Sequence, residues 1–342
     1  MLAHNYMPAV KYGAKWLASE IMPAGGLGMG NVYYVIKSTE TYYSQFVSDY
    51  GVDYSDGTNS ICTDAGSTVT PWANTGIQDA LDKCVAGRND YVIVMPSILD
   101  YDTNTTLLMT KRSVHLIAPA GLTYERGANN STKLHLNVAA LPMITVTGDN
   151  CEVSGFYMKN FYDGTNACGQ HILLGAGSTG CTVRFNHFVV RCANATNTSV
   201  VEGTSTGAGY ARIENNWFES QASGAYTIPA YITASAGATH LRVCNNDIEV
   251  SQANIVTSAI GLPQFGLAAG NWIIAVQANP PQATLAGVIT TGITLAGSAV
   301  AIDNKFCGCA ANFSGGTAAK TYTGNMDSST GANGGYGANL EA

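Results

Sequence analysis

The chain has 342 residues, a formal net charge of −7 and only 11% charged residues. A chain of this length predicts two domains or one elongated repeat architecture rather than one compact core. Because basic residues are few and outnumbered by acidic ones, we expect no nucleic-acid partner. The abundance of Gly, Ala, Ser, Thr and Asn favours strands and tight turns over long helices.

Residues 1–70 are interpreted as an N-terminal extension. Residues 1–22 contain no uninterrupted apolar segment behind a basic start, so we predict no secretory signal peptide. No stretch of the chain reaches eighteen apolar residues, which predicts no membrane span. Residues 31–57 are rich in tyrosine and are typical of strands and loops with an aromatic surface. Tyrosine is favoured where protein surfaces meet, so this extension is a candidate attachment segment.

Residues 75–86 form the clearest helix of the sequence. Apolar residues recur at helical spacing, and Thr75 with Gln78 forms a capping box. Strands are predicted next, at residues 91–97 and 113–119. A helix just before the first strands would cover the open end of a strand stack, whose backbone would otherwise pair with another chain. We therefore predict a short N-terminal capping helix.

Four segments between Cys151 and Val250 align without a gap, thirty residues apart. One apolar column is Val153, Val183, Ile213 and Val243, and a second is Met158, Phe188, Phe218 and Ile248. Alternation along a strand points both columns inward. A third apolar column, Ile144, Ile172, Val201 and Ile232, precedes Gly- and Ser-rich turns. Three short strands per repeat predict an all-β fold, a right-handed single-stranded parallel β-helix over residues 71–326 with about eight or nine coils.

An asparagine marks one corner of each coil, at Asn186, Asn216 and Asn246. Asparagine tolerates the left-handed backbone of a sharp bend, and its amide can bond to the asparagine above and below. We predict an asparagine ladder across this turn. Further corners at 270–272, 303–304 and 323–326 continue the pattern with uneven spacing, which predicts insertions near Pro263 and Pro280. The Gly-rich residues 327–342 are predicted to be a tail.

Alternation also identifies an outward-facing strip, where a site on a β-helix would lie. Its candidate surface and glycan-binding residues are Tyr157, His187, Trp217 and Asp247, with Glu219 and Glu249 beside them. Aromatic faces next to carboxylates suit sugar binding, and two carboxylates about 5 Å apart match the spacing in retaining glycosidases. In the competing interpretation the carboxylates are solvated and the aromatic residues lie under a loop or at a subunit interface. We therefore assign no catalytic residue, and Glu219 and Glu249 stay as candidates.

The basic residues of the repeat lie on another outward face. Arg212 and Arg242 stack one coil apart, with Arg184 and Glu214 nearby. Two like charges about 5 Å apart in water repel by only about 1 kcal/mol, so the charges by themselves require no anionic ligand.

The nine cysteines lack the paired spacing of a zinc site, and their number is odd. This pattern predicts mostly buried thiols, and we expect neither a metal site nor a cofactor. Free thiols without a signal peptide suit a protein that is made and folded in a reducing cytoplasm.

The helix TGIQDALDKC, the strands YVIVMPS and SVHLIAP and the asparagine corners together resemble the pectate-lyase-like superfamily of right-handed parallel β-helices, in the form found in phage tailspikes and other virion-associated proteins. The resemblance covers residues 71–326. It implies a virion structural protein that is assembled in the host cytoplasm: a capsid decoration, fibre or tailspike-like subunit of a bacteriophage-like particle. It also implies a homotrimer, and we expect attachment to a capsid or tail protein through residues 1–70.

Two other classes of function stay open. A polysaccharide depolymerase, either a glycoside hydrolase or a lyase, would act through Glu219 and Glu249, and a secreted β-helical adhesin would bind without turnover. Pectate lyases of this superfamily use calcium-binding aspartates with a basic residue, and no cluster of aspartates on adjacent coils of this sequence matches that pattern. We expect binding of a host-surface glycan rather than enzymatic activity.

Overall fold

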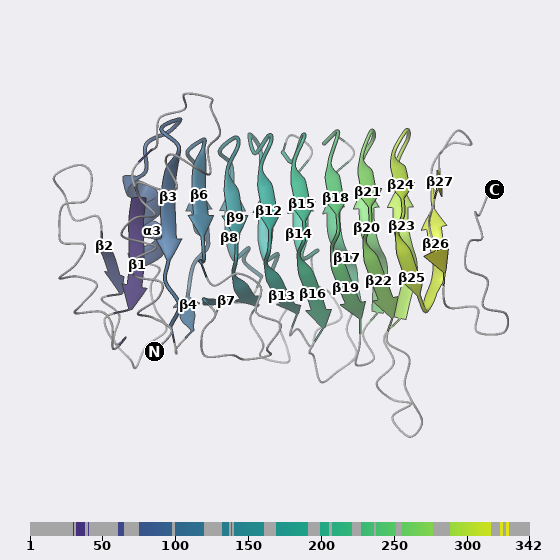
Figure 1. Cartoon of the computed structure of the whole chain (residues 1–342), viewed down its shortest axis with the longest axis horizontal. Helices are drawn as coiled ribbons and strands as arrows, with labels where there is room; N and C mark the ends of the chain where they lie inside the picture. Colours follow the sequence, from purple (N-terminus) through teal and green to yellow (C-terminus); the bar gives the residue numbers. More distant parts are fainter. Residues whose placement is uncertain are drawn as a thin grey trace, which may run out of the picture.

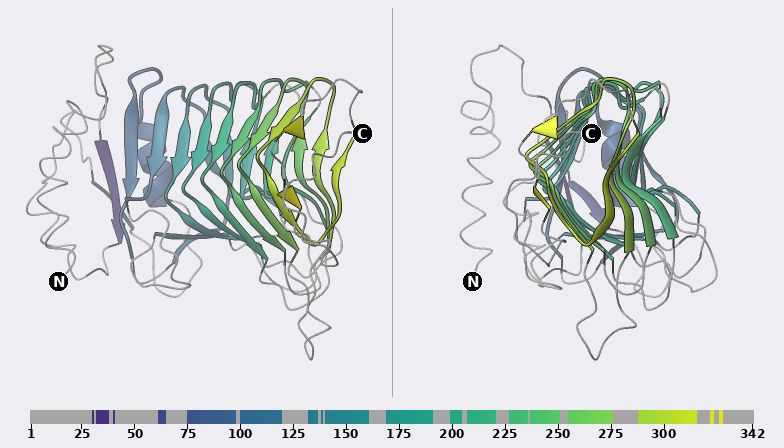
Figure 2. Two further views of the ribbon diagram at one scale, coloured as in Figure 1. Left: turned by 45° about the vertical axis from the view of Figure 1, so that its right-hand side comes forward. Right: turned by 90° about the vertical axis from the view of Figure 1, so that its right-hand side faces the viewer.

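The structure is a computed structural model of the whole chain. It describes residues 30, 32–37, 40, 61–64, 75–97, 100–119, 132–136, 138, 140–160, 169–190, 199–204, 207–220, 227–235, 237–250, 255–275, 288–315, 322–323 and 326–327. Over these residues the protein is nearly all β, with strands stacked into three parallel sheets (Figure 1). Viewed end-on, the three sheets surround one interior (Figure 2). The predicted all-β parallel β-helix is confirmed.

We call the three sheets A, B and C and give their strands in order along the stack. Sheet A contains β2 (Ile61–Asp64), β1 (Val32–Lys37), β3 (Asp90–Val94), β6 (Val114–Ile117), β9 (Glu152–Ser154), β12 (Thr182–Arg184), β15 (Arg212–Glu214), β18 (Arg242–Cys244), β21 (Leu267–Ala269), β24 (Val300–Ile302) and β27 (Tyr322–Thr323). Sheet B contains β4 (Tyr101–Thr103), β7 (Lys133–Leu136), β10 (Tyr157–Lys159), β13 (His187–Val190), β16 (Trp217–Ser220), β19 (Asp247–Val250), β22 (Trp272–Ala275), β25 (Lys305–Cys307) and β28 (Met326–Asp327). Sheet C contains β5 (Leu107–Met109), β8 (Ile144–Val146), β11 (Ile172–Leu174), β14 (Val201–Gly203), β17 (Thr227–Ala234), β20 (Ile255–Leu262), β23 (Val288–Leu295) and β26 (Cys309–Ser314).

The inward-facing side chains of the three sheets fill the interior. In one coil, Ile213 from sheet A, Phe218 from sheet B and Ile232 from sheet C are all buried in the same core. Columns form because equivalent residues pair between coils, and the rings of Phe188 and Phe218 stack with centroids 4.8 Å apart. Burying each such side chain contributes about 1.5–3 kcal/mol. The apolar columns predicted from the repeat are therefore confirmed.

The thirty-residue spacing holds only in the middle of the stack. Val183 pairs with Val153 and with Ile213, as predicted, but Val243 pairs with Ala268 and Ala268 with Ala301. The predicted insertion near Pro263 is wrong, because β20 and β21 are joined by the short connection 263–266. The connection 276–287, which contains Pro280, lies outside the described residues.

The asparagine ladder is confirmed, and it extends beyond the four regularly spaced segments. Five buried asparagines stack along it, Asn186, Asn216, Asn246, Asn271 and Asn304. The Oδ1 atom of Asn216 accepts hydrogen bonds from the backbone N–H and the Nδ2 of Asn186, at 3.0 and 3.2 Å. The same two bonds recur from Asn246 to Asn271, 25 residues away, and from Asn271 to Asn304, 33 residues away. Buried amides satisfied in this way hold consecutive coils together.

The left-handed backbone of this corner lies one residue before the ladder, which differs from our expectation. The residues with positive φ are Gly155, Phe185, Asn215, Asn245, Gly270 and Asp303, with φ between 52° and 84°. The ladder asparagines are therefore used for their amides and not for their tolerance of this conformation.

The predicted capping helix is present as α3 (Thr75–Lys83), which ends before residue 86. Its residues Ile77, Ala80 and Leu81 are part of the core. The side-chain amide of Gln78 accepts a bond from Leu108 N–H at 2.8 Å and donates to Leu108 O at 3.3 Å. The Gln78 amide thus pairs with the open edge of β5, whereas the predicted capping-box contact involves the Thr75 side chain, which lies outside the described residues. The helix thus closes the end of sheet C.

Sheet A continues beyond this helix, because two strands of residues 1–70 belong to it. Tyr33 pairs with Val92 across β1 and β3, and β2 extends the sheet by one more strand (Figure 1). Tyr33 and Tyr34 are buried, so they do not contribute to the aromatic surface expected here. The boundary placed at residue 71 therefore does not separate these strands from the stack. The other residues of 1–70 except 30 and 40, together with residues 328–342, lie outside the described residues.

Candidate functional site

The structure brings the predicted outward strip of sheet B together. Tyr157, His187, Trp217 and Asp247 pair directly across successive strands. The His187 ring stacks on Trp217 with centroids 4.0 Å apart and meets the edge of Tyr157 at 4.8 Å. The His187 ring is thus in contact with a neighbouring ring on either side, and His187 is buried. The column is a packed aromatic stack rather than an open row of rings.

Glu219 forms the centre of this strip together with His187. His187 Nε2 lies 3.0 Å from Glu219 Oε2, and the two side chains are only 4% and 2% exposed. An ionised carboxylate only accepts, so with Glu219 ionised the donor in this contact is His187 Nε2. Alternation predicted that Glu219 faces outward, and the competing interpretation had it solvated, but the side chain is buried. Alternation gives the direction of a side chain, but it does not reveal what covers it.

Glu219 and Glu249 lie opposite each other on adjacent coils, as the repeat predicted. Glu249 is partly exposed, whereas Glu219 is buried and bound to His187. A retaining glycosidase needs both carboxyl groups beside the scissile bond. The strip therefore does not present two accessible carboxylates.

Two other titratable groups at this strip, Tyr231 and Asp247, have raised pKa values. The Tyr231 hydroxyl lies 3.4 Å from the backbone oxygen of Glu249. Burial, together with the nearby carboxylates of Glu219 and Glu249, raises the pKa of the Tyr231 phenol. Desolvation also raises the pKa of Asp247 above its ordinary value. Tyr231 is buried and its phenol holds its proton, so it does not have the character expected of a nucleophile or base.

A charge network that the repeat did not predict extends the strip toward the N-terminal coils. Lys159 Nζ lies 3.0 Å from Asp100 and 5.4 Å from the centre of the Tyr157 ring. Lys133 Nζ lies 4.0 Å from the same aspartate. Asp100 and Lys133 lie on coils that precede the thirty-residue repeat, so the repeat did not predict their positions. Asp100 is shared by two lysines, so the carboxylate is engaged by the fold and the three side chains carry one excess positive charge.

On the outer face of sheet A, Glu152 is the centre of a second network. His115 Nδ1 lies 3.3 Å and Arg184 Nε 2.7 Å from its carboxylate. Burial alone would raise the pKa of Glu152, but the hydrogen bonds from His115 and Arg184 outweigh it and hold this pKa at about 2. Arg184 is therefore paired with Glu152 within the fold.

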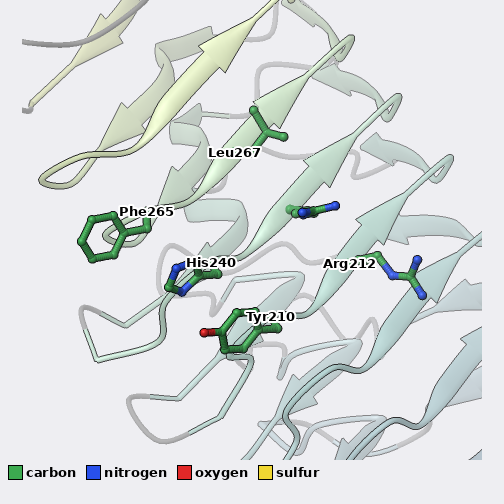
Figure 3. A pocket seen from close by; sticks show the side chains of 6 residues that line it. Tyr210, Arg212, His240, Phe265 and Leu267 are labelled. Carbon is green, nitrogen blue, oxygen red and sulfur yellow. The ribbon is translucent and has the colours of Figure 1, made fainter.

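Farther along sheet A, six residues line a half-open hollow of about 410 Å³ (Figure 3). They are Tyr210, Arg212, His240, Arg242, Phe265 and Leu267. The three rings stack on one another along one side of the hollow, and the two arginines with Leu267 line the other side. Sequence reasoning singled out the arginines but missed the rings. The signal was available, because Tyr210 and His240 each lie three residues before an inward residue of the repeat.

Comparison with known protein families, curated proteins and solved structures found no match for this chain. Within the described residues, no group of three or more His, Cys, Asp or Glu side chains is arranged to hold a metal ion. The helix in the described part of the chain is too short to span a membrane.

Proposed function

We propose that this chain is a structural protein of a virion, as a spike, fibre or capsid-decoration subunit of a bacteriophage-like particle, and that it acts by binding rather than by turnover. The observation that carries the binding role is the His187–Glu219 contact. The carboxylate that hydrolysis would require is buried and already bonded at 3.0 Å. The virion assignment is supported by the resemblance of the cap helix and corner repeats to tailspike-type β-helices.

A rigid rod suits such a role. Five asparagines connect consecutive coils through buried hydrogen bonds, and the interior is filled along the stack. Strands spaced about 4.8 Å apart give a rod on the order of 50 Å for the longest sheet. A rod of this kind holds its outer faces at fixed positions, which is what a presented binding surface needs.

A polysaccharide depolymerase is the alternative, and the register of Glu219 with Glu249 favours it. The Glu219→Gln variant separates the two functions. A hydrolase that uses this pair would lose nearly all cleavage of its polymer, whereas a binding protein would show no cleavage in either form. Release of reducing ends from capsular polysaccharide measures the difference.

The virion assignment is tested by particle incorporation. We expect the chain to co-purify with particles made by the organism that encodes it and to run in solution at about three times its mass of 35.7 kDa. Deleting residues 1–70 would remove β1, which is part of sheet A, so the attachment test should delete only residues 1–29. We expect this shorter chain to fold and to be lost from particles. Recovery of the full-length chain only in the particle-free fraction would contradict the assignment.

A further inference from the structure

The hollow on sheet A carries an exposed stack of three rings. Tyr210 and His240 lie with centroids 4.5 Å apart and almost parallel planes, and His240 and Phe265 lie 5.3 Å apart (Figure 3). Parallel rings in contact are about 3.5 Å apart, so these centroid distances mean that each ring is displaced sideways from the next. Parts of the ring faces therefore stay open, and Tyr210 is 59% and Phe265 48% exposed.

All three ring-bearing residues have a left-handed backbone. Their φ values are 57°, 61° and 59°, a conformation that is unfavourable for bulky side chains. The same turn of the two preceding coils has Asn150 and Gly180, which adopt this conformation easily. The fold thus does not need aromatic residues at this turn. Strain that persists on an exposed surface points to a use outside the core.

The arginines opposite the rings carry uncompensated charge. Arg212 and Arg242 pair across β15 and β18, one coil apart. Among the described residues neither of them forms an ion pair, and Arg212 has only a 3.4 Å contact with the Thr182 hydroxyl. Arg184, on the same face, is bonded to Glu152 at 2.7 Å. Two adjacent guanidinium groups without an ion-pair partner are complementary to an anionic group, which they can bind in a bidentate manner.

We propose that this hollow binds an acidic saccharide, with a sugar ring against the open faces of Tyr210 and Phe265 and its carboxylate on Arg212 and Arg242. The inference rests on the proposed binding role and gives it a place and a ligand class. The rings are too close together to admit a planar base between them, since that needs about twice the contact distance. A saccharide lies over the offset rings without separating them.

Binding is tested by calorimetry with the full chain. The probes are oligosaccharides that contain glucuronate, galacturonate or sialate, each beside its carboxyl methyl ester as the uncharged counterpart. We expect at least one acid form to bind, and its ester to bind at least tenfold more weakly. Arg242→Gln should weaken binding of the acid form at least tenfold, whereas Lys305→Gln on sheet B should leave it unchanged. Equal binding of acid and ester, or no binding of any acid form, would overturn the proposal.

A second pair of variants separates a binding role of the rings from a packing role. Tyr210→Asn and Phe265→Asn restore the residue type that Asn150 shows at this turn. If the rings serve a ligand, the melting temperature should be equal or higher and affinity should fall at least tenfold. A lower melting temperature with unchanged affinity would show that the rings only pack. Particle incorporation is measured separately, so a chain that is present in virions but does not bind these probes overturns this inference alone.

Discussion

Asn216 and Asn246 are joined by two hydrogen bonds to one acceptor: the backbone N–H and the Nδ2 of Asn216 both donate to Asn246 Oδ1 at 3.0 Å. Because Asn216 in turn accepts two bonds from Asn186, each ladder amide is satisfied from both neighbouring coils. Removing one amide therefore leaves unpaired groups on two coils.

The ladder predicts that Asn216→Ala lowers the free energy of unfolding by about 2–5 kcal/mol, since several buried polar groups lose their partners. Asn186→Ala is the matched control. The Oδ1 of Asn186 accepts one bond among the described residues, from Phe156 N–H, so the loss should be smaller. Denaturation in urea measures both variants. Equal losses, or a loss below about 0.5 kcal/mol for Asn216→Ala, would contradict the role assigned to the ladder.

The His187–Glu219 contact predicts a different response to conservative and disruptive changes. Glu219→Gln keeps an acceptor for His187 and should cost less than about 1 kcal/mol. His187→Phe keeps a ring on Trp217 but removes the Nε2 donor from a buried carboxylate, and should cost about 2–3 kcal/mol. The double variant His187→Phe with Glu219→Leu removes both polar groups and should recover much of this loss. A double variant that is no more stable than His187→Phe would argue against a buried hydrogen bond between these two side chains. Urea midpoints provide the comparison.

Glu152 predicts a pH-dependent contribution to stability. Its pKa is held at about 2 in the folded protein, below its ordinary value of 4.5, so its contribution is complete above about pH 5 and is lost as the pH falls toward 2. Glu152→Gln should therefore destabilise the protein at pH 7 by on the order of 2 kcal/mol, and the difference from the parent should shrink toward pH 2.5. Glu214→Gln, at a carboxylate without an ion pair among the described residues, is the control. A difference that stays constant between pH 7 and 2.5 would contradict this assignment.

His171 predicts a second pH dependence at less acidic values. It is completely buried, with Nε2 3.2 Å from the Val189 carbonyl, and burial lowers its pKa to about 4. The unfolded chain binds a proton near pH 6.5 and the folded chain does not, so stability is lost as the pH falls from 6.5 toward 4. The loss at pH 5 is about 2 kcal/mol. His171→Gln should remove this part of the pH profile, as measured by urea denaturation at pH 7 and pH 5. An unchanged profile would show that other groups cause it.

Much of the fold could be predicted because one period governs its centre. The positions of Ile213, Phe218 and Asn216 follow from the thirty-residue spacing and from alternation alone. The pairing of Tyr33 with Val92 could not be predicted in this way, because no repeat connects them. A local sequence pattern indicates that a segment forms a strand, but it does not indicate which strand it pairs with.

The candidate site was predicted less well than the fold. Alternation placed His187 and Glu219 on the outer face, yet both are buried, because burial there depends on what packs over the sheet. The position of the Phe265 ring could not be predicted for a different reason. The ladder residues of its coil, Asn246 and Asn271, are 25 residues apart, so Phe265 does not follow Tyr210 and His240 at the regular spacing of the repeat.

The ladder joins coils separated by 25, 30 and 33 residues with the same pair of hydrogen bonds. The differences in length fall in the connections between strands and not in the strands of sheets A and B that flank the ladder. The number of coils and the lengths of the connections can thus change independently in this architecture. A tandem copy of residues 181–210 would lengthen the rod by one strand spacing, about 4.8 Å, and would bring its own asparagine to the corner. Such a protein can grow by duplication while its connections diverge, without change to the interior that holds it together.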